Sequence, residues 1–495
     1  RNHVHARCGR QADGDGAGRR RGGLRAATPQ TTSWDYDARG FLAAKTYADG
    51  SRVAYAHDAD GLLTGRTWAR GAVTSYAYDA AGRATGRSYG DGATPAVSLA
   101  LDFLDRPVSV TDAAGTRSLA YGADGRLASE TVPNLAGAEI TYTHDAEGRR
   151  TGMELGGGGE VFAQAFYAYD AMGRVATAGN AADTLAYSYL PGSGLVASAG
   201  WGPGASRNAL EYTYDRHRRL TGIAAGGSPV CGYALDGRNL RTGASLPDGT
   251  AWEYGYDGLG QLGEAVRRDG AGAVLDSMEY RYDLAGNRTG AVENNAATAY
   301  SSNIVNQYTA VNDDAPAYDE DGNMLTNGDW SYEWNGENRL ARAENAMTGA
   351  RLEFGYDYMG RRVFKKVRQG DLLVKHLIFA YDGYKLIAEF DALDGNAQTA
   401  GYLWQPSGQD VPLMRTAGTA VEYLVADGNK NIVQIRDAEG NATDGYAYEP
   451  FGQCRHAGAS ANPFRFSSEY HDDETGLVYY NYRHYSPKLG RWISR

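Results

Sequence analysis

Carboxylate side chains are the most numerous groups in this sequence that could do acid–base chemistry. The densest cluster near the end of the chain is Asp472-Asp473-Glu474. Two carboxyl groups that share one proton form the catalytic pair of aspartic proteases, so the cluster is a formal candidate for peptide hydrolysis. Carboxylates occur throughout the chain, however, and their spacing singles out no pair. We therefore interpret 472–474 as a polar turn between two strands and assign no catalytic residue.

Metal-ligand patterns are equally indistinct. Three Asp-rich segments superficially resemble calcium loops: Asp58–Gly61, Asp319–Asn323 and Asp437–Asn441. An EF-hand loop needs oxygen ligands through its twelfth position, where a bidentate Glu is required, and none of the three continues in that way. The cysteines are too few and too scattered for a Cys-rich site or a disulfide framework; they are Cys8, Cys231 and Cys454. We predict neither a metal nor another cofactor, and we expect these Asp side chains to cap turns.

Aromatic side chains on an exposed sheet can stack on sugar rings. The tryptophans that could do so are Trp34, Trp68, Trp201, Trp252, Trp330, Trp334, Trp404 and Trp492. Packing within a wall is the simpler role for most of them, because Tyr and Trp bury a large ring while keeping a polar handle. Glycan binding therefore stays an alternative.

The composition excludes several protein classes. The chain has 495 residues, 42% of them hydrophobic, with 66 Gly, 36 Tyr and only 11 Phe. This hydrophobic content excludes a disordered chain, and the abundance of Tyr and Gly argues against a helical bundle. The net charge of −11 argues against nucleic acid as the main partner. No apolar run reaches the 18 or more residues that a membrane helix needs.

One unit recurs from Trp34 onward: an aromatic residue, Asp, two variable residues and Gly, often followed by Arg or Asn. Asp37, Asp58 and Asp79 lie 21 residues apart, a fixed period that indicates a repeat architecture. The clearest turn positions are Asp79 with Gly82, Asp170 with Gly173, Asp283 with Gly286, and Asp357 with Gly360.

Each unit reads as one β-hairpin. Tyr-x-Tyr before the Asp places both rings on one face of a strand. The Asp caps the turn through backbone N–H groups, and Gly supplies the positive φ of a three-residue loop with a bulge. About 14 units then give on the order of 28 strands, too many for an open twisted sheet. We therefore predict an all-β fold in which serial hairpins coil into a spiral wall.

These repeats resemble those of the rearrangement-hotspot (Rhs) family, which also occur in the C component of insecticidal toxin complexes and in teneurins. Asn306-Gln307-Tyr308 and Tyr446–Gly452 are similar to further boxes of that family. The segment Asn462–Trp492 resembles the Rhs-associated core motif. Its matching residues are Pro463, Phe464, Arg465, Phe466, Gly476, Tyr479, Tyr480, Arg483, Tyr485, Pro487, Gly490, Arg491 and Trp492.

The resemblance implies a hollow shell, or β-cocoon, that encloses a C-terminal toxin polypeptide in toxin-bearing relatives. It implies a non-enzymatic protein, secreted or displayed on the surface of a bacterium. Partners would be the enclosed toxin of the same gene, with secretion-system components or an immunity protein. In some relatives a downstream Asp-containing segment cuts the toxin free; this chain ends at Arg495 without that segment, and we interpret it as an incomplete reading frame. The rival hypothesis is a cell-surface adhesin that binds glycans.

Three segments are expected along the chain. We expect residues 1–33 to be a flexible basic lead-in, with non-native sequence as an alternative interpretation. Residues 34–445 are expected to form the repeat shell, and residues 446–495 the core motif, truncated at its C-terminal end. The stretch 462–495 is too short to bury a core of its own, yet it carries eight aromatic side chains. We expect it to close or line the shell, with a strand that joins the last turn of the wall.

Overall fold

A computed structural model describes residues 30–202, 208–406, 410–456 and 458–495. The basic lead-in expected over 1–33 lies outside the described residues except for its last four. Strands dominate the described residues, and one three-residue 3-10 helix, η1 (Phe466–Ser468), interrupts them. The prediction of an all-β fold is confirmed.

The strands fall into three antiparallel sheets of 26, 14 and four strands. The first sheet, called the first coil, consists of β1 (Ser33–Tyr36), β2 (Leu42–Thr46), β3 (Arg52–His57), β4 (Leu63–Thr67), β5 (Val73–Tyr78), β6 (Ala84–Tyr89), β7 (Val97–Leu101), β8 (Pro107–Asp112), β9 (Gly115–Tyr121), β10 (Leu127–Thr131), β11 (Glu139–His144), β12 (Arg150–Gly157), β13 (Glu160–Tyr169), β14 (Val175–Gly179), β15 (Thr184–Tyr189), β16 (Val196–Gly200), β17 (Ala209–Tyr214), β18 (Leu220–Ala225), β19 (Ser228–Leu235), β20 (Arg241–Ser245), β21 (Ala251–Tyr256), β22 (Leu262–Arg268), β23 (Val274–Tyr282), β24 (Arg288–Glu293), β25 (Ala296–Ser302) and β26 (Tyr308–Val311). The second sheet, called the second coil, consists of β27 (Ala317–Tyr318), β28 (Met324–Asn327), β29 (Trp330–Trp334), β30 (Leu340–Asn345), β31 (Ala350–Tyr356), β32 (Arg362–Gln369), β33 (Leu372–Asp382), β34 (Lys385–Asp391), β35 (Ala397–Trp404), β36 (Pro412–Ala417), β37 (Ala420–Ala426), β38 (Ile432–Arg436), β39 (Ala442–Tyr448) and β40 (Cys454–His456). The third sheet, called the core-motif sheet, consists of β41 (Tyr470–Asp472), β42 (Leu477–Tyr480), β43 (Arg483–Ser486) and β44 (Arg491–Trp492).

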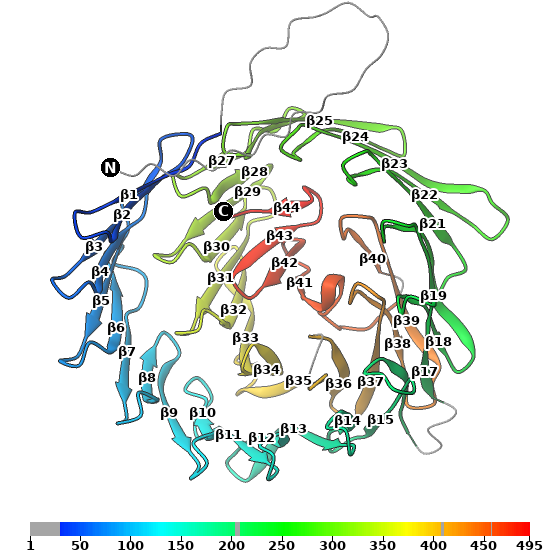
Figure 1. Ribbon diagram of the computed structural model, residues 1–495, viewed down its shortest axis with the longest axis horizontal. Helices are drawn as coiled ribbons and strands as arrows, with labels where there is room; N and C mark the ends of the chain where they lie inside the picture. Colours follow the sequence, from blue (N-terminus) through cyan, green and yellow to red (C-terminus); the bar gives the residue numbers. More distant parts are fainter. Residues whose placement is uncertain (1–29, 203–207, 407–409, 457) are drawn as a thin grey trace, which may run out of the picture.

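Every strand of a coil pairs with the next strand in the sequence, so each coil is an unbroken meander. Figure 1 shows the first coil bending into a ring and the second coil following a tighter path within it. A sheet of 26 strands cannot stay open and twisted, and winding resolves this constraint. The predicted spiral wall is confirmed in this form.

The hairpin at 78–84 shows how the repeat sequence makes its turn. The Asp79 N–H donates to the Arg83 carbonyl over 3.0 Å, and the Gly82 N–H donates to the Asp79 carbonyl over 3.0 Å. Asp79 Oδ1 also accepts the N–H groups of Ala81 and Arg83 at 2.9 and 3.0 Å. The backbone φ is 77° at Gly82 and at Gly173, 87° at Gly286 and 79° at Gly360, positive as predicted. The register shifts between Ala77 and Tyr78, which is the expected bulge.

The predicted number of strands was too low. The two coils hold 40 strands among the described residues, which form 20 hairpins rather than about 14. Several hairpins lack the Tyr-Asp-x-x-Gly signature but keep its bonding. In the loop after β25, Asn303 Oδ1 accepts the N–H groups of Val305 and Gln307 at 3.0 and 2.9 Å, and Asn306 takes the positive φ. The turn needs an acceptor and a left-handed residue, and Asn supplies both.

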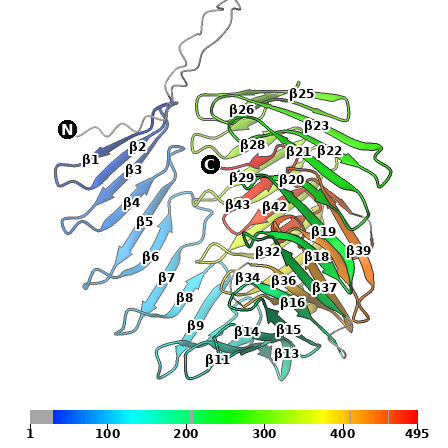
Figure 2. The same cartoon turned by 45° about the vertical axis from the view of Figure 1, so that its right-hand side comes forward.

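The end of the chain does not add a strand to the wall. Instead β41–β44 form their own sheet, and Figure 1 places it near the centre of the ring. In Figure 2 the same strands lie behind β19–β22, so both views place them inside the coil. The expectation of a strand joining the last turn was wrong because the wall ends at β40. The wall also continues through β39 across the expected boundary at 445/446.

Replacing a turn glycine should destabilise the protein through its backbone conformation. We expect Gly82→Ala to lower the free energy of unfolding by about 1–2 kcal/mol, because an L side chain disfavours positive φ. The control is Gly65→Ala in β4, where an added Cβ has no neighbour closer than 3.7 Å and φ is not positive. Denaturant midpoints for the two variants measure the difference. Equal midpoints would contradict the turn geometry.

Candidate functional site

At most turns of the wall, the aromatic residue before the turn links its hairpin to the preceding one. The Tyr78 hydroxyl donates to the Leu63 carbonyl over 2.9 Å, across the step from β5 to β4. The same bond recurs along the wall from Tyr121, Tyr169, Tyr189, Tyr214, Tyr256, Tyr282, Tyr356, Tyr381 and Tyr448, at 2.6–2.9 Å. Trp334 and Trp404 donate from their indole nitrogens instead, to the carbonyls of Met324 and Leu386. Phe has no such donor, which accounts for the excess of Tyr.

The Arg that follows the turn Gly links neighbouring hairpin tips along one rim. Arg361 Nε donates to Asp357 Oδ2 over 2.7 Å, and its Nη1 reaches the Gly383 carbonyl of the next hairpin over 2.6 Å. Arg83 and Arg174 repeat the arrangement with the carbonyls of Asp102 and Ser193. The predicted turn residues therefore lie in a row along the rim and do not converge on one site.

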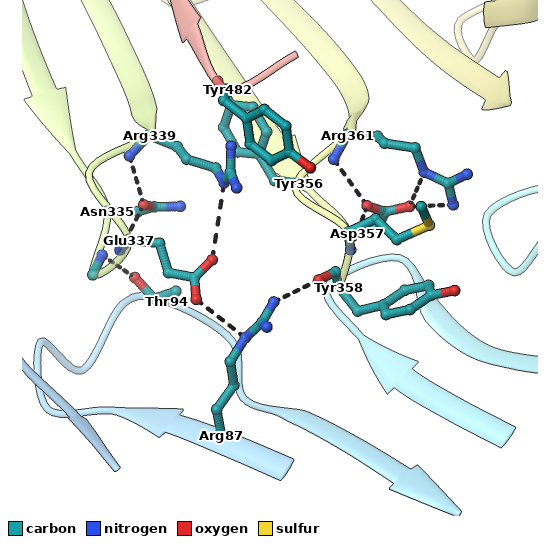
Figure 3. Close-up of polar contacts among 12 residues, drawn as sticks. Arg87, Thr94, Asn335, Glu337, Arg339, Tyr356, Asp357, Tyr358, Arg361 and Tyr482 are labelled. Carbon is teal, nitrogen blue, oxygen red and sulfur yellow. Dashed lines mark hydrogen bonds and ion pairs between the residues drawn. The ribbon is translucent and has the colours of Figure 1, made fainter. Parts of the chain in front are cut away.

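The two coils meet along a seam, defined here by the contacts that β4–β9 and their connections make with hairpin tips of the second coil. Figure 3 shows Arg87 of β6 reaching between two of those tips. Its Nε lies 3.1 Å from Glu337 Oε1, and its Nη2 donates to the Tyr358 carbonyl over 2.5 Å. Thr94 Oγ1 accepts the Gly336 N–H over 2.7 Å. Asp112 Oδ2 likewise accepts the Tyr358 N–H over 2.8 Å.

Buried charges reinforce this seam. Arg117 of the first coil lies 2.7 Å from Glu130 and 3.5 Å from Asp357 of the second coil, and all three side chains are buried. Asp321 pairs with Arg70 at 2.9 Å, and burial raises the pKa of its carboxyl. The sequence predicts that Asp321 caps its turn. It instead contacts Arg70, which lies 251 positions earlier in the chain. The spacing of the repeats does not indicate this contact. Asp319 of the same loop caps the turn as predicted.

The core-motif sheet is held on the second coil by aromatic packing. Phe464 contacts Tyr402 and Trp404 edge to face, with ring centroids 4.9 and 5.0 Å apart. Tyr470 packs against Phe379 in the same way at 5.7 Å. The Tyr479 hydroxyl accepts the Arg362 N–H over 2.8 Å. Phe464, Tyr470 and Tyr479 are thus buried against the wall, as expected for a segment that lines the shell, whereas Tyr482 is exposed.

Asp472 lies at the centre of a buried ion cluster that joins this sheet to β32. It accepts Arg362 Nη1 at 2.6 Å and Lys365 Nζ at 2.9 Å, and Lys365 also reaches Glu474 at 2.9 Å. Although burial raises its pKa, the two cations outweigh that effect and hold the Asp472 pKa well below its usual range. His484 beside it is buried, which lowers its pKa to about 3. A carboxylate held ionised by two cations differs from the proton-sharing acid pair of an aspartic protease, and here it joins the core-motif sheet to β32.

The remaining residues of the core motif contact one another and the two other segments that resemble family motifs, residues 306–308 and 446–452. Arg491 donates to the Asn306 carbonyl and lies over the Tyr308 ring at 4.1 Å. The Tyr485 hydroxyl donates to the Phe451 carbonyl over 2.9 Å. Trp492 packs edge to face on Tyr480 and Tyr485, and Arg483 lies over its ring. Arg465 pairs with Asp473, and Phe466 stacks near Tyr485. Pro463 and Pro487 are buried, and Gly476 and Gly490 take positive φ.

Other sequence-based candidates lie in the wall. The structure describes all eight tryptophans, and only Trp34 is exposed, with 36% of its surface accessible to solvent. Trp201 and Trp252 are buried, and each stacks on one tyrosine ring, Tyr423 and Tyr254 respectively, which favours the packing interpretation. In the part of the chain that the structure describes, no group of three His, Cys, Asp or Glu residues is placed to hold a metal ion. Within that same part, no helix is both long and apolar enough to cross a bilayer.

Comparisons with known proteins agree with this geometry. The teneurin YD-shell family profile matches residues 248–495, and the RHS repeat profile matches 36–71 and 57–94. The chain is 26% identical over 324 residues to tRNA nuclease WapA of Bacillus subtilis, covering 58% of this chain and 13% of that protein. It is 27% identical over 468 residues to toxin protein Tse5 of Pseudomonas aeruginosa, covering 75% of this chain and 35% of that protein. The crystal structure of TcdB2-TccC3-TEV superposes with a TM-score of 0.65 at 17% identity, over 94% of this chain and 27% of that one, which shows the fold.

Removing one repeat hydroxyl should weaken the wall where it is buried. We expect Tyr356→Phe to cost about 1–3 kcal/mol of unfolding free energy, because the buried Leu340 carbonyl loses its donor. The control is Tyr36→Phe at the exposed repeat position in β1, where we expect a change within about 0.5 kcal/mol. Thermal or denaturant unfolding compares the two. A Tyr356→Phe variant as stable as Tyr36→Phe would refute the role of the hydroxyl.

Breaking the buried ion cluster should be costly. We expect Asp472→Asn to destabilise by about 3–5 kcal/mol, because Arg362 and Lys365 would stay buried with less compensation. The adjacent Asp473→Asn is the control, since that side chain is largely exposed and should cost less than about 1 kcal/mol.

The same pair of variants tests the pH dependence. The folded Asp472 pKa is lowered, so its contribution is complete above the ordinary Asp pKa of about 4 and is lost as pH falls below it. Unfolding midpoints recorded from pH 7 to pH 3 should fall in the parent and in Asp473→Asn. They should fall less steeply in Asp472→Asn. Parallel pH curves for all three proteins would contradict the assignment.

Proposed function

Because this chain belongs to the teneurin YD-shell family, we propose that it forms the non-enzymatic wall of a bacterial toxin-delivery protein. In this proposal the coils enclose a toxin polypeptide of the same gene that follows the core motif, and they carry it to a target cell. The curated relatives named above are called a nuclease and a toxin. The chain spans 13% and 35% of their lengths, so their activities belong to much longer proteins.

One observation carries this proposal: the core-motif sheet lies inside the coil. The Met324 N–H donates to the Ile493 carbonyl over 2.8 Å, and the Arg495 guanidinium lies over the Tyr47 ring at 4.0 Å. Met324 belongs to the second coil and Tyr47 to the first, so the last residues are held between the two coils. A polypeptide that continued from Arg495 would therefore start between the two coils, where Figure 1 marks the C-terminus.

The same arrangement suggests different roles for the wall and for the core motif. We assign the strands through β40 to the wall, and the segment after β40, which carries β41–β44, to the core motif that seats the wall's contents. Secretion-system components and an immunity protein are the further partners of this proposal, with a secreted or surface location. The adhesin alternative needs exposed aromatic side chains; among the tryptophans only Trp34 is exposed, which supports that alternative less well.

Protease protection tests the enclosure. An unstructured peptide with a single protease site is fused after Arg495, and in a second protein the same peptide precedes Arg1 as the control. We expect the site after Arg495 to be cut more slowly, because the wall excludes the protease, and both sites to be cut equally after denaturation. Equal cutting of the two native proteins would overturn enclosure. Binding of those proteins to immobilised glycans would then favour the adhesin.

A further inference from the structure

A cavity of about 310 Å³ lies where the first coil, the second coil and the core motif meet. Arg150 at the start of β12 contributes from the first coil. The hairpin between β33 and β34 contributes from the second coil, and residues around Glu469 contribute from the core motif. Tyr384 lines the cavity, and because its side chain is 40% exposed, the cavity is open to solvent beside it. Neither the turn geometry nor the enclosure requires a cavity at this position.

Aromatic rings form much of its lining. They belong to Tyr381, Trp404, Phe464, Tyr470 and Tyr479. The polar ends of several of these side chains are already engaged: Tyr381 and Trp404 donate to wall carbonyls, and Tyr479 accepts from Arg362. What these side chains can still offer is mainly ring surface. Ring faces carry negative potential and attract cations at distances up to about 6 Å.

The charged lining residues differ in whether they have partners. Arg150 forms an ion pair with Asp382. Lys385 Nζ donates to the Gln405 carbonyl over 2.5 Å and lies 3.8 Å from Asp410. The Glu469 carboxylate, by contrast, receives no hydrogen bond from any residue that the structure describes. Burial raises the pKa of Glu469 to about 8, with Lys430 lowering it and Asp410 raising it to smaller extents.

We propose that this cavity binds one alkylammonium group, with Glu469 as the acceptor of its N–H groups and the aromatic rings around its carbon chain and charge. The lining contains two basic and three acidic side chains, so a single positive charge balances it once Glu469 is ionised. An anion would instead meet two cations that already have partners and an acid that has none. The ammonium belongs either to a lysine side chain of a polypeptide or to a small free amine. This inference does not depend on the enclosure proposed above.

Calorimetric titration of the full chain with n-butylammonium at neutral pH tests the site. We expect saturable binding, and no binding of 1-pentanol, which has a similar shape without the charge. Glu469→Gln should weaken binding at least about tenfold, as expected for loss of a charged hydrogen-bond acceptor. Glu160→Gln removes an exposed carboxylate at the start of β13 and should leave binding unchanged. Binding that persists in Glu469→Gln, equal binding of 1-pentanol, or no binding of n-butylammonium would each overturn the proposal.

A second measurement on the unmodified protein serves if Glu469→Gln does not fold. The ammonium takes the place of a proton on Glu469, so affinity should rise from pH 6 to about pH 8 and binding should release protons to the buffer. Lys430, Asp410, Lys385, Arg150 and Asp382 are the other charged groups around it. A pH-independent affinity without proton release would contradict the role of Glu469. Titration with N-acetyl-lysine amide distinguishes the sources, because its binding indicates a lysine side chain and its exclusion indicates a free amine.

Discussion

The hydrogen bond that most repeat tyrosines donate to the preceding hairpin is the interaction on which the wall depends. A hairpin alone is marginally stable, and a long meander can slip or flatten wherever neighbouring pairs are not fixed. The Tyr356 hydroxyl on the Leu340 carbonyl places one hairpin relative to the one before it. Trp334 makes the same bond through its indole nitrogen, so the requirement is a donor on an aromatic ring and not tyrosine itself. Repetition of this bond, with Arg links such as Arg361 to Gly383, fixes each step along the wall.

Winding then creates the interfaces that a single hairpin lacks. The seam pairs side chains of the first coil with loops of the second, and it buries charges such as Arg117 with Glu130 and Asp357. The core-motif sheet lies inside the wound sheet, and the ion pair between Asp472 and Arg362 helps to hold it there. Burying such ion pairs adds little net stability in general, but breaking one is costly. The charges therefore specify where the two coils and the inner sheet meet more than they strengthen the fold.

The sequence predicts those parts of the structure whose local backbone conformation requires particular residue types. Asp79 and Gly82 predict their turn because few other residue types can cap the turn, as Asp79 does, or adopt positive φ, as Gly82 does. The prediction undercounted hairpins because Asn303 and Asn306 meet the same needs with a different signature. It could not place Asp321 against Arg70, or Arg491 against Asn306, because contacts across a seam follow the winding and have no sequence period. The resemblance identified the core motif, but its seat inside the coil depends on the burial of Asp472, which its sequence neighbours do not indicate.

The account rests on the core-motif sheet being held inside the coil, against β31–β34. Hydrogen exchange of backbone amides in the intact chain measures this directly, because protected amides report buried and paired strands. We predict that β42 and β43 exchange as slowly as β32 and β33, and far more slowly than the exposed hairpin tips at Met172 and Leu259. Exchange of β42 and β43 as fast as those tips would show a sheet that is not seated in the wall, and would contradict the account.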